Sequence, residues 1–202
     1  MNVLVKKLGK EINMIKKNVF IFIIIGLLVC FSIETVLSNK LIIKDGVIES
    51  IKIGESAKKI FSIFKSRYRI DDVTKPHSVR TITLFRDSKK VITFSIDPTD
   101  PKERIFLIYV YSDYVTPENI GSGSTLFEAI NVYGNGNIIP TDEGYMIAFN
   151  RLKGIAFLLN NDGIPKELQN IPDDVFTPEQ EKKIMAFAKK IRISAIQIFM
   201  KE

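Results

Sequence analysis

The longest apolar stretch of the chain lies close to its amino terminus. Val19 to Ile33 include no charged residue, and apolar residues resume after Glu34 as far as Leu37. A membrane span needs about 20 predominantly apolar residues, and residues 18–38 reach that length if Glu34 lies at the far interface. The run is apolar on every side, whereas a core helix of a globular domain normally keeps a polar face. The pattern therefore predicts an N-terminal transmembrane helix.

Basic residues before this stretch set its expected orientation. The lysines within residues 6–17 should remain in the cytoplasm, which places everything after Asn39 outside. We expect an uncleaved signal anchor in the plasma membrane, crossing once and contacting membrane lipid through residues 18–38. Two alternatives stay open. Cleavage after Ser38 would release a secreted or periplasmic protein, and Cys30 could carry a lipid.

Beyond the anchor, the hydrophobic pattern predicts a first α+β unit over residues 39–115. Lys44-Asp45-Gly46 lies between two apolar runs and indicates a hairpin. Ser56 is suited to cap a helix whose apolar face ends at Phe64. Residues rich in Ile, Val, Thr, Phe and Tyr then predict strands. These expected strands cover residues 80–85, 91–96 and 104–112.

The same order recurs in residues 116–202. An offset of 69 positions pairs Gly54 with Gly123, Ser56 with Thr125, and Phe64 with Tyr133. Strands should follow the second helix as they follow the first, at residues 145–149, 154–159 and 191–200. The sequence thus predicts an α+β fold in which two helix–strand–strand–strand repeats form an antiparallel sheet with helices on one face.

The second repeat carries an insertion at residues 160–190. Thr177-Pro178-Glu179-Gln180 combines a capping hydroxyl, a proline in the first turn and a glutamine three positions on, which predicts a helix start. The apolar residues that follow share one helical face. They are Ile184, Phe187, Ala188 and Ile191.

A Gly-x-Ser/Thr turn, an amphipathic helix ending in Phe or Tyr, and a following antiparallel sheet resemble two kinds of small extracytoplasmic domain. These are the β-lactamase-inhibitor-protein type, itself a tandem duplication, and the outer-membrane barrel-assembly lipoprotein type. The resemblance covers residues 51–112 and 120–200, and the chain lacks the paired cysteines common in the inhibitor type. It implies a protein that binds other proteins and is not an enzyme. It rests on Gly54, Ser56, Phe61, Phe64, Gly123, Thr125, Ile130, Tyr133 and Gly134.

Composition and charge narrow the function classes. The net charge is +6, of which the first 38 residues supply +3, so the remainder is only mildly basic. No dense basic stripe with interleaved aromatic residues is present, and we expect no nucleic acid partner. One cysteine and one histidine exclude an intrachain disulfide and a Cys/His zinc site.

The remaining polar clusters favour turns over chemistry. His77 lies in a polar stretch without a motif, and Asp71-Asp72 and residues 97–100 lack the spacing of a calcium loop. Gly121 to Thr125 match neither a phosphate-binding loop nor a nucleophile elbow, and indicate a tight turn into a helix cap. We therefore expect no catalytic, cofactor-binding or metal-binding residue, and no enzyme activity.

Tyr109 and Tyr111 are the candidate partner-binding residues. Strand alternation places them on one face, with Ile108 and Val110 on the other. An exposed tyrosine face would be a binding surface, while a face covered by the insertion helix would be core. The leading hypothesis is a membrane-anchored extracytoplasmic protein that binds an envelope protein or itself. The alternative is a small-ligand-binding or sensor domain, and a third reading is an enzyme that uses converging carboxylates.

Overall fold

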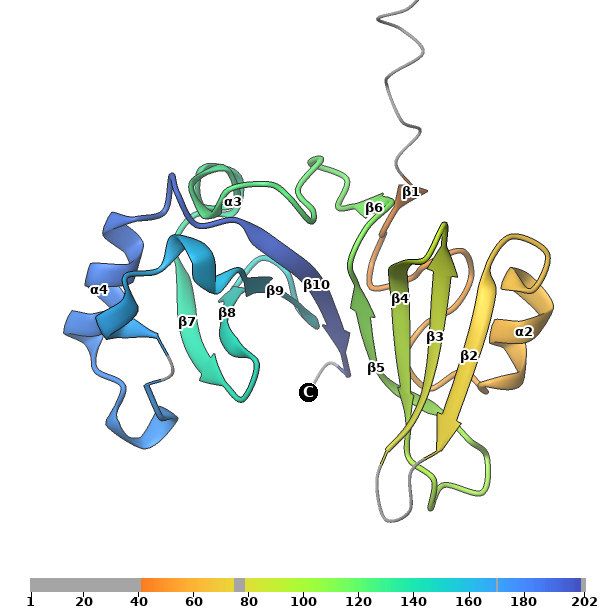
Figure 1. The fold of residues 1–202 in the computed structure, drawn as a ribbon. Coiled ribbons are helices and arrows are strands. Elements are labelled where there is room, and N and C mark those ends of the chain that lie inside the picture. The colour runs from red at the N-terminus through yellow and green to blue at the C-terminus, as the bar shows by residue number, and fades with distance from the viewer. Residues whose placement is uncertain (1–40, 75–78, 170, 201–202) are drawn as a thin grey trace, which may run out of the picture. The chain divides into compact units, whose positions relative to one another are not determined.

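The computed structural model describes residues 41–74, 79–169 and 171–200 (Figure 1). Leu41–Glu202 form one compact unit, and the description that follows is of this unit alone. The predicted anchor at residues 18–38, with Cys30, and the loop residue His77 lie outside the described residues. Within the described ranges, no helix has both the length and the apolar character that a membrane crossing requires.

The described residues contain three α-helices, three short 3₁₀ helices and ten strands. The helices are α2 (Lys58–Phe64), α3 (Leu126–Tyr133) and α4 (Pro178–Ala186), and the 3₁₀ helices are η1 (Asn161–Gly163), η2 (Lys166–Leu168) and η3 (Asp173–Val175). The strands of the first half are β1 (Leu41–Ile42), β2 (Arg69–Thr74), β3 (Arg80–Arg86), β4 (Lys89–Ile96), β5 (Ile105–Val110) and β6 (Tyr114–Val115). Those of the second half are β7 (Gly136–Thr141), β8 (Gly144–Phe149), β9 (Ile155–Leu159) and β10 (Ile193–Phe199).

Eight of these strands form one sheet in the order β2-β3-β4-β5-β10-β9-β8-β7, with every neighbouring pair antiparallel. The two halves meet where β5 pairs with β10, and Tyr109 lies directly opposite Gln197 at this seam. The α+β class and the antiparallel sheet are confirmed. All six strands that the sequence predicts are present, with small changes at their ends.

Each half, however, contributes four strands to this sheet after its helix and not three. The additional strands are β2 and β7, and they form the two edges of the sheet. Sequence reasoning missed β2 because its residues, RIDDVT, are mostly charged or polar, and missed β7 because GNIIPT contains both glycine and proline. Edge strands tolerate such residues, since one of their two sides makes no ladder hydrogen bonds.

The two halves use matching hydrogen bonds where each helix begins. The amide of Gly54 donates to the carbonyl of Ile105, 2.7 Å away, and the amide of Gly123 donates to the carbonyl of Ile193, 2.8 Å away. Both glycines have a left-handed φ, +86° and +90°. Glycine adopts this conformation at little cost, so the same sequence feature produces the same turn at an offset of 69 positions.

Both repeat helices pack an aromatic ring onto the sheet. Phe64 ends α2 and is fully buried, with its ring centre 6.1 Å from that of Phe94. Tyr133 ends α3, with ring centres 5.3 Å from Phe149 and 6.0 Å from Phe157. The expected equivalence of Phe64 and Tyr133 therefore holds for their burial and for their place on the helix.

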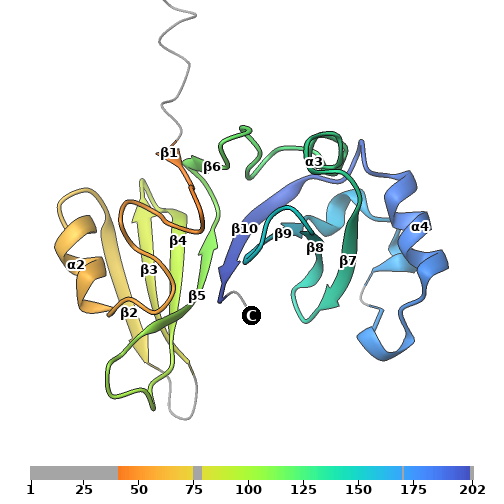
Figure 2. The same ribbon diagram turned by 180° about the vertical axis from the view of Figure 1, so that it is seen from behind.

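These aromatic contacts lie on the same face of the sheet. Residues paired directly across antiparallel strands share a face, and cross-strand pairs connect Phe94 through Ile108 and Ile198 to Ile155. Phe157 lies two residues beyond Ile155 and so points the same way. Hence α2 and α3 cover one face of the sheet. Figure 2 shows the chain that leads into α2 passing in front of β3 and β4.

The segment before α2 differs from the expected hairpin. β1 pairs in parallel with β6, so Leu41 lies beside Tyr114 instead of pairing within residues 41–53. Lys44 and Val47 close one tight turn, and Ile48 and Ile51 close a second. Ile43, Ile48 and Ile51 of this segment lie in the core, whereas Ile42 is exposed.

The insertion packs around the outer strand of the second half. Thr177 and Gln180 form the predicted capping box at the start of α4. The amide of Ile138 in β7 donates to Glu181 Oε1 at 2.9 Å, which occupies a hydrogen-bonding group on this edge strand. The expectation that one helical face continues to Ile191 is wrong, since α4 ends at Ala186. Ala188 and Ile191 are still buried, whereas the Phe187 side chain is 36% exposed.

Candidate functional site

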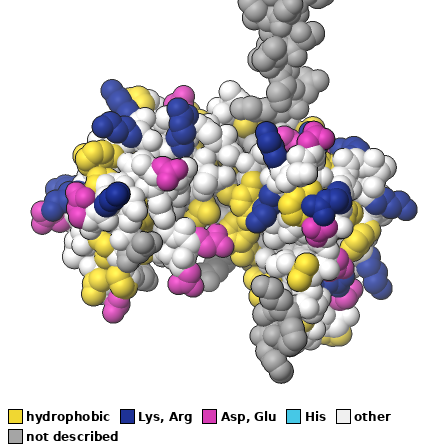
Figure 3. Space-filling model, viewed as in Figure 1, with side chains coloured by type: hydrophobic (Ala, Val, Ile, Leu, Met, Phe, Trp, Pro, Cys, Tyr) yellow, Lys and Arg dark blue, Asp and Glu magenta, His cyan; other side chains and the backbone are white. Residues whose placement is uncertain are grey.

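The second face of the sheet carries no helix among the described residues, and we call it the open face. At its centre the seam strands β5 and β10 present Tyr109, Gln197 and Phe199, with Thr93 beside them on β4. Figure 3 shows hydrophobic side chains gathered in the middle of the view, where Figure 1 has β5 and β10. The face also includes Thr83, Leu107, Tyr111, Met146, Ala148 and Leu158.

Tyr109 and Tyr111 lie on the open face and are partly exposed. Their rings are 6.3 Å apart between centres and inclined by only 21°, so they form a side-by-side aromatic surface. Lys90 places its ammonium 4.8 Å from the ring centre of Tyr111. Ile108 and Val110 point to the covered face and are buried, as strand alternation predicts. The insertion helix does not convert these tyrosines into core.

The two phenols are held in their neutral form. Burial raises the pKa of both Tyr109 and Tyr111, and the nearby carboxylate of Glu143 raises both further. A hydrogen bond with Thr93 acts in the opposite direction on the pKa of Tyr111 without reversing the shift. Glu143 belongs to the turn between β7 and β8, so the second half supplies an acidic side chain near the tyrosines of the first half.

Small polar residues line the centre of this face. The hydroxyls of Thr83 and Thr93 lie 3.1 Å apart, within hydrogen-bonding distance. Thr93 and Ser95 face the same side and are buried. The resulting surface combines aromatic rings with hydroxyl and amide groups, a composition that suits contact with another molecule.

The candidate acidic clusters serve local structure. Asp97 accepts hydrogen bonds from the amide and hydroxyl of Thr99, and Asp100 bonds to Arg104 and to the amide of Lys102, so each closes its own loop. These bonds lower the pKa of both carboxyls. Over the parts of the chain that the structure describes, no group of three or more His, Cys, Asp or Glu residues is placed to hold a metal ion.

The glycine-rich segment before α3 is the tight turn that the sequence predicts. Thr125 and Glu128 form a capping box at the start of the helix. A Cβ atom on Gly121 would lie 2.8 Å from the carbonyl oxygen of Tyr114, so the turn leaves no room for a side chain there. The glycine is explained by packing, without a bound anion.

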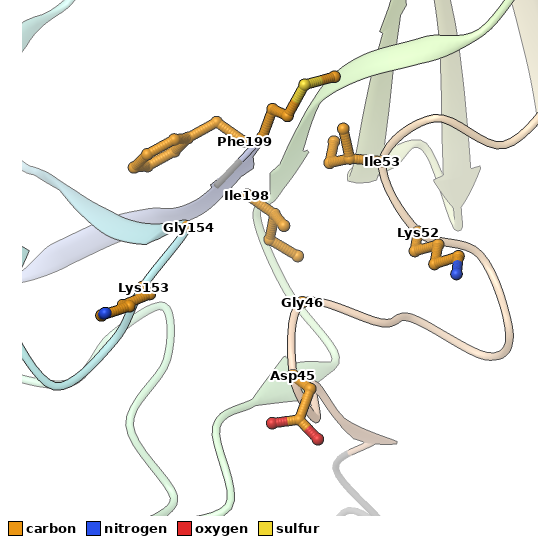
Figure 4. A pocket seen from close by; sticks show the side chains of 9 residues that line it. Asp45, Gly46, Lys52, Ile53, Lys153, Gly154, Ile198 and Phe199 are labelled. Carbon is orange, nitrogen blue, oxygen red and sulfur yellow. The ribbon is translucent and has the colours of Figure 1, made fainter. Parts of the chain in front are cut away.

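A small hollow lies at the seam between the two halves, at the end of β10 (Figure 4). Its volume is about 260 Å³, below the roughly 300–1,000 Å³ of ordinary ligand pockets. Sequence reasoning did not locate it, because it forms between segments that are distant in the chain. It is lined by Asp45, Gly46, Lys52, Ile53, Lys153, Gly154, Ile198, Phe199 and Met200. A second hollow of about 430 Å³ lies beside Arg104, Phe106 and Met200.

Comparison with known proteins yields one distant structural neighbour. No protein-family model and no curated protein matches the chain. The fold is similar to the crystal structure of the uncharacterized protein yfeY from Escherichia coli, with a TM-score of 0.45 and 15% sequence identity. The match covers 66% of this chain and 82% of that chain. The resemblance to the inhibitor and barrel-assembly types therefore stays a prediction.

Proposed function

We propose that this protein is a membrane-anchored extracytoplasmic binding module whose partner, an envelope protein or a second copy of the chain, docks on the open face. The observation that carries the proposal is the position of Tyr109 and Tyr111, partly exposed near the centre of a sheet face that no described helix covers. The apolar stretch at residues 18–38 supports the membrane location. The matching glycine turns before α2 and α3 support a duplicated fold with one shared sheet.

The energetics of interfaces favour this region over the rest of the face. Large aromatic side chains in partly enclosed positions carry most of the binding energy at protein interfaces, while polar residues at the rim carry little. Tyr109 and Tyr111 already occupy fixed positions, since each packs against the other and Gln197 lies 3.5 Å from the Tyr109 hydroxyl. Preorganised rings lose less conformational entropy on binding.

The decisive experiment separates binding from folding. A photo-crosslinking amino acid placed at Tyr109 or Tyr111 in the full chain, in native membranes, should give a discrete crosslinked species. The same group at Phe106 is the control, because this side chain is 37% exposed on the same strand but at its other end. Crosslinking to a second copy would indicate self-association.

The matching substitutions are Tyr109→Ala and Tyr111→Ala. Each should weaken partner capture by about 2 kcal/mol or more, roughly thirtyfold in affinity, while the domain stays folded. Loss of folding in both variants would assign these tyrosines to the core and contradict the proposal. Equal crosslinking at Phe106 and at the tyrosines would also contradict it.

The alternative, a small-ligand-binding or sensor domain, has the seam hollow in its favour. The hollow combines the apolar side chains of Ile53 and Ile198 with the charged residues Lys52, Lys153 and Asp45 (Figure 4), a combination suited to a small amphiphile with a polar headgroup. Native mass spectrometry of the full chain in detergent would test it. A co-purifying small molecule that Lys52→Glu and Lys153→Glu displace would support this function, and an empty protein would oppose it.

A further inference from the structure

Aromatic and basic side chains gather at a place outside the open face. Phe127 in the first turn of α3 is 40% exposed, and Phe187 just after α4 is 36% exposed. The ammonium of Lys189 lies 5.0 Å from the ring centre of Phe127, and that of Lys190 lies 5.8 Å from that of Phe187. The amide of Phe127 donates to the carbonyl of Ala188 at 3.1 Å. We call Phe127, Phe187, Lys189 and Lys190 the aromatic–lysine patch.

The patch lies at the end of the domain where the described chain begins. Figures 1 and 2 show α3, the turn before β10, and β1 at the same end of the described unit. Ile42 in β1 is 58% exposed at that end. Only Asn39 and Lys40 separate the predicted anchor from Leu41. Three residue steps span at most about 11 Å, so an anchored chain must keep Leu41 close to the membrane surface.

The chemistry of the patch suits the polar region of a lipid bilayer. Aromatic rings concentrate at this level, and lysine chains lie along apolar surface while their ammonium groups reach the phosphates. Here each lysine already extends over a phenyl ring. The neighbouring acid Glu128 is engaged in the helix cap, where it accepts hydrogen bonds from Thr125, and Arg192 helps to lower its pKa. The charge of the patch itself is positive.

We propose that the aromatic–lysine patch rests on anionic lipid headgroups and fixes how the domain is held above the bilayer. The inference rests on the proposed anchor. Lipid is the occupant that the positive charge and the nearby start of the domain favour. Docking at this end leaves the open face, on a different side of the unit, free for a partner.

Tryptophan fluorescence offers a direct test, because the chain contains no tryptophan. Full-length Phe127→Trp is reconstituted into vesicles of phosphatidylcholine, alone or mixed with phosphatidylglycerol. With anionic lipid, its emission should shift to shorter wavelength and be quenched by brominated acyl chains. Phe106→Trp, at the far end of β5, is the control and should keep the emission of a water-exposed tryptophan. Phe187→Trp repeats the measurement if the first variant misfolds.

The lysines supply the charge test. Each of Lys189→Gln and Lys190→Gln should reduce the ratio of docked to undocked protein about fivefold, since a basic residue near an anionic surface contributes roughly 1 kcal/mol. Added salt should reduce docking of the parent protein and have little effect on the double variant.

Flotation with neutral vesicles in high salt separates the possible failures. A chain that floats while Phe127→Trp emits as in water with both lipid mixtures would keep the anchor and overturn this inference. A chain that does not float would overturn the anchor and the inference together. If Phe127→Trp is shielded from water in native membranes but not in vesicles of pure lipid, a protein partner covers the patch. That result also overturns the proposal.

Discussion

Replacing Phe64 by alanine tests whether α2 is held by its terminal aromatic ring. The Phe64 side chain is fully buried, with ring centres 5.7 Å from Tyr68 and 6.1 Å from Phe94. Truncation of a buried phenylalanine costs about 3–5 kcal/mol, because apolar surface is lost from the core and a cavity remains. The edge-on contact with Tyr68 contributes beyond simple burial, so we expect a value in the upper part of that range.

Tyr133→Ala in the second half should cost at least as much. Its ring packs on Phe149 and Phe157, and its hydroxyl bonds to Thr116 at 2.5 Å and Glu118 at 2.7 Å. Removing it leaves the buried Thr116 hydroxyl without that partner, which adds about 1–3 kcal/mol. Phe127→Ala on the same helix is the matched control, since its side chain is 40% exposed.

The assay is urea unfolding of the full chain in detergent, followed by circular dichroism. The control variant should lower the free energy of unfolding by about 1 kcal/mol or less. A loss of about 4–5 kcal/mol corresponds to a fall in Tm of roughly 8–20 °C for a domain of this size. A loss below about 1.5 kcal/mol for Phe64→Ala, or an equal loss for Phe127→Ala, would refute the packing argument.

Three further predictions concern the turns, the charges and the topology. Gly54→Ala and Gly123→Ala should each lower the free energy of unfolding in urea by about 1–2 kcal/mol, because both positions have a left-handed φ. A Cβ would meet no atom within 4 Å at either position, so no steric clash adds to this cost. Unequal costs would contradict the equivalence of the turns. Burial opposes ionisation of Glu49, but hydrogen bonds from Arg67 and Tyr114 outweigh it and lower its pKa below the ordinary 4.5. The unfolded chain therefore binds the proton first, and this carboxylate's contribution to stability is complete above pH 4.5 and lost as the pH falls through the folded pKa. Acid titration should show a smaller loss for Glu49→Gln, and an unchanged loss would remove Glu49 from that account. A reporter that is active only in the cytoplasm should be silent when fused after Glu202, and its activity would reverse the proposed orientation.

Helices α3 and α4 and the central strands were predictable because local signals and packing agree there. The expected cap of α2 by Ser56 is wrong, since this helix begins after Ala57 without a side-chain cap. Thr125 and Thr177 each precede a residue that completes a capping box, and both boxes form. The strand RIFLIYVYS is rich in residues that favour strands, and β5 lies at the seam of the sheet. Consistent signals of this kind are what a single stable fold requires.

The uncovered face could not be predicted from the sequence. Alternation correctly separated Tyr109 from Ile108, but it could not say which face the insertion would leave bare. The apolar residues of α4 would fit either side of a sheet equally well. Long-range strand pairing determines which face stays uncovered. β10 pairs with β5, and the insertion before β10 packs at the outer strand of the second half.

Local pattern also failed at Phe187. Its spacing from Ile184 and Ala188 suits a buried helical position, yet α4 stops one residue earlier and the chain turns toward β10. That deviation exposes one ring of the aromatic–lysine patch.

The two outer strands limit how any partner can be recognised. A chain that tried to extend the sheet beside β2 would meet Arg69, Asp71 and Asp72, and beside β7 it would meet Pro140 and the side chain of Glu181. Neither edge strand is therefore well suited to pair with the backbone of another chain. A partner must then bind through contacts with side chains and not through backbone pairing. Its affinity would depend on its shape and chemistry, and an extended peptide of arbitrary sequence would bind weakly.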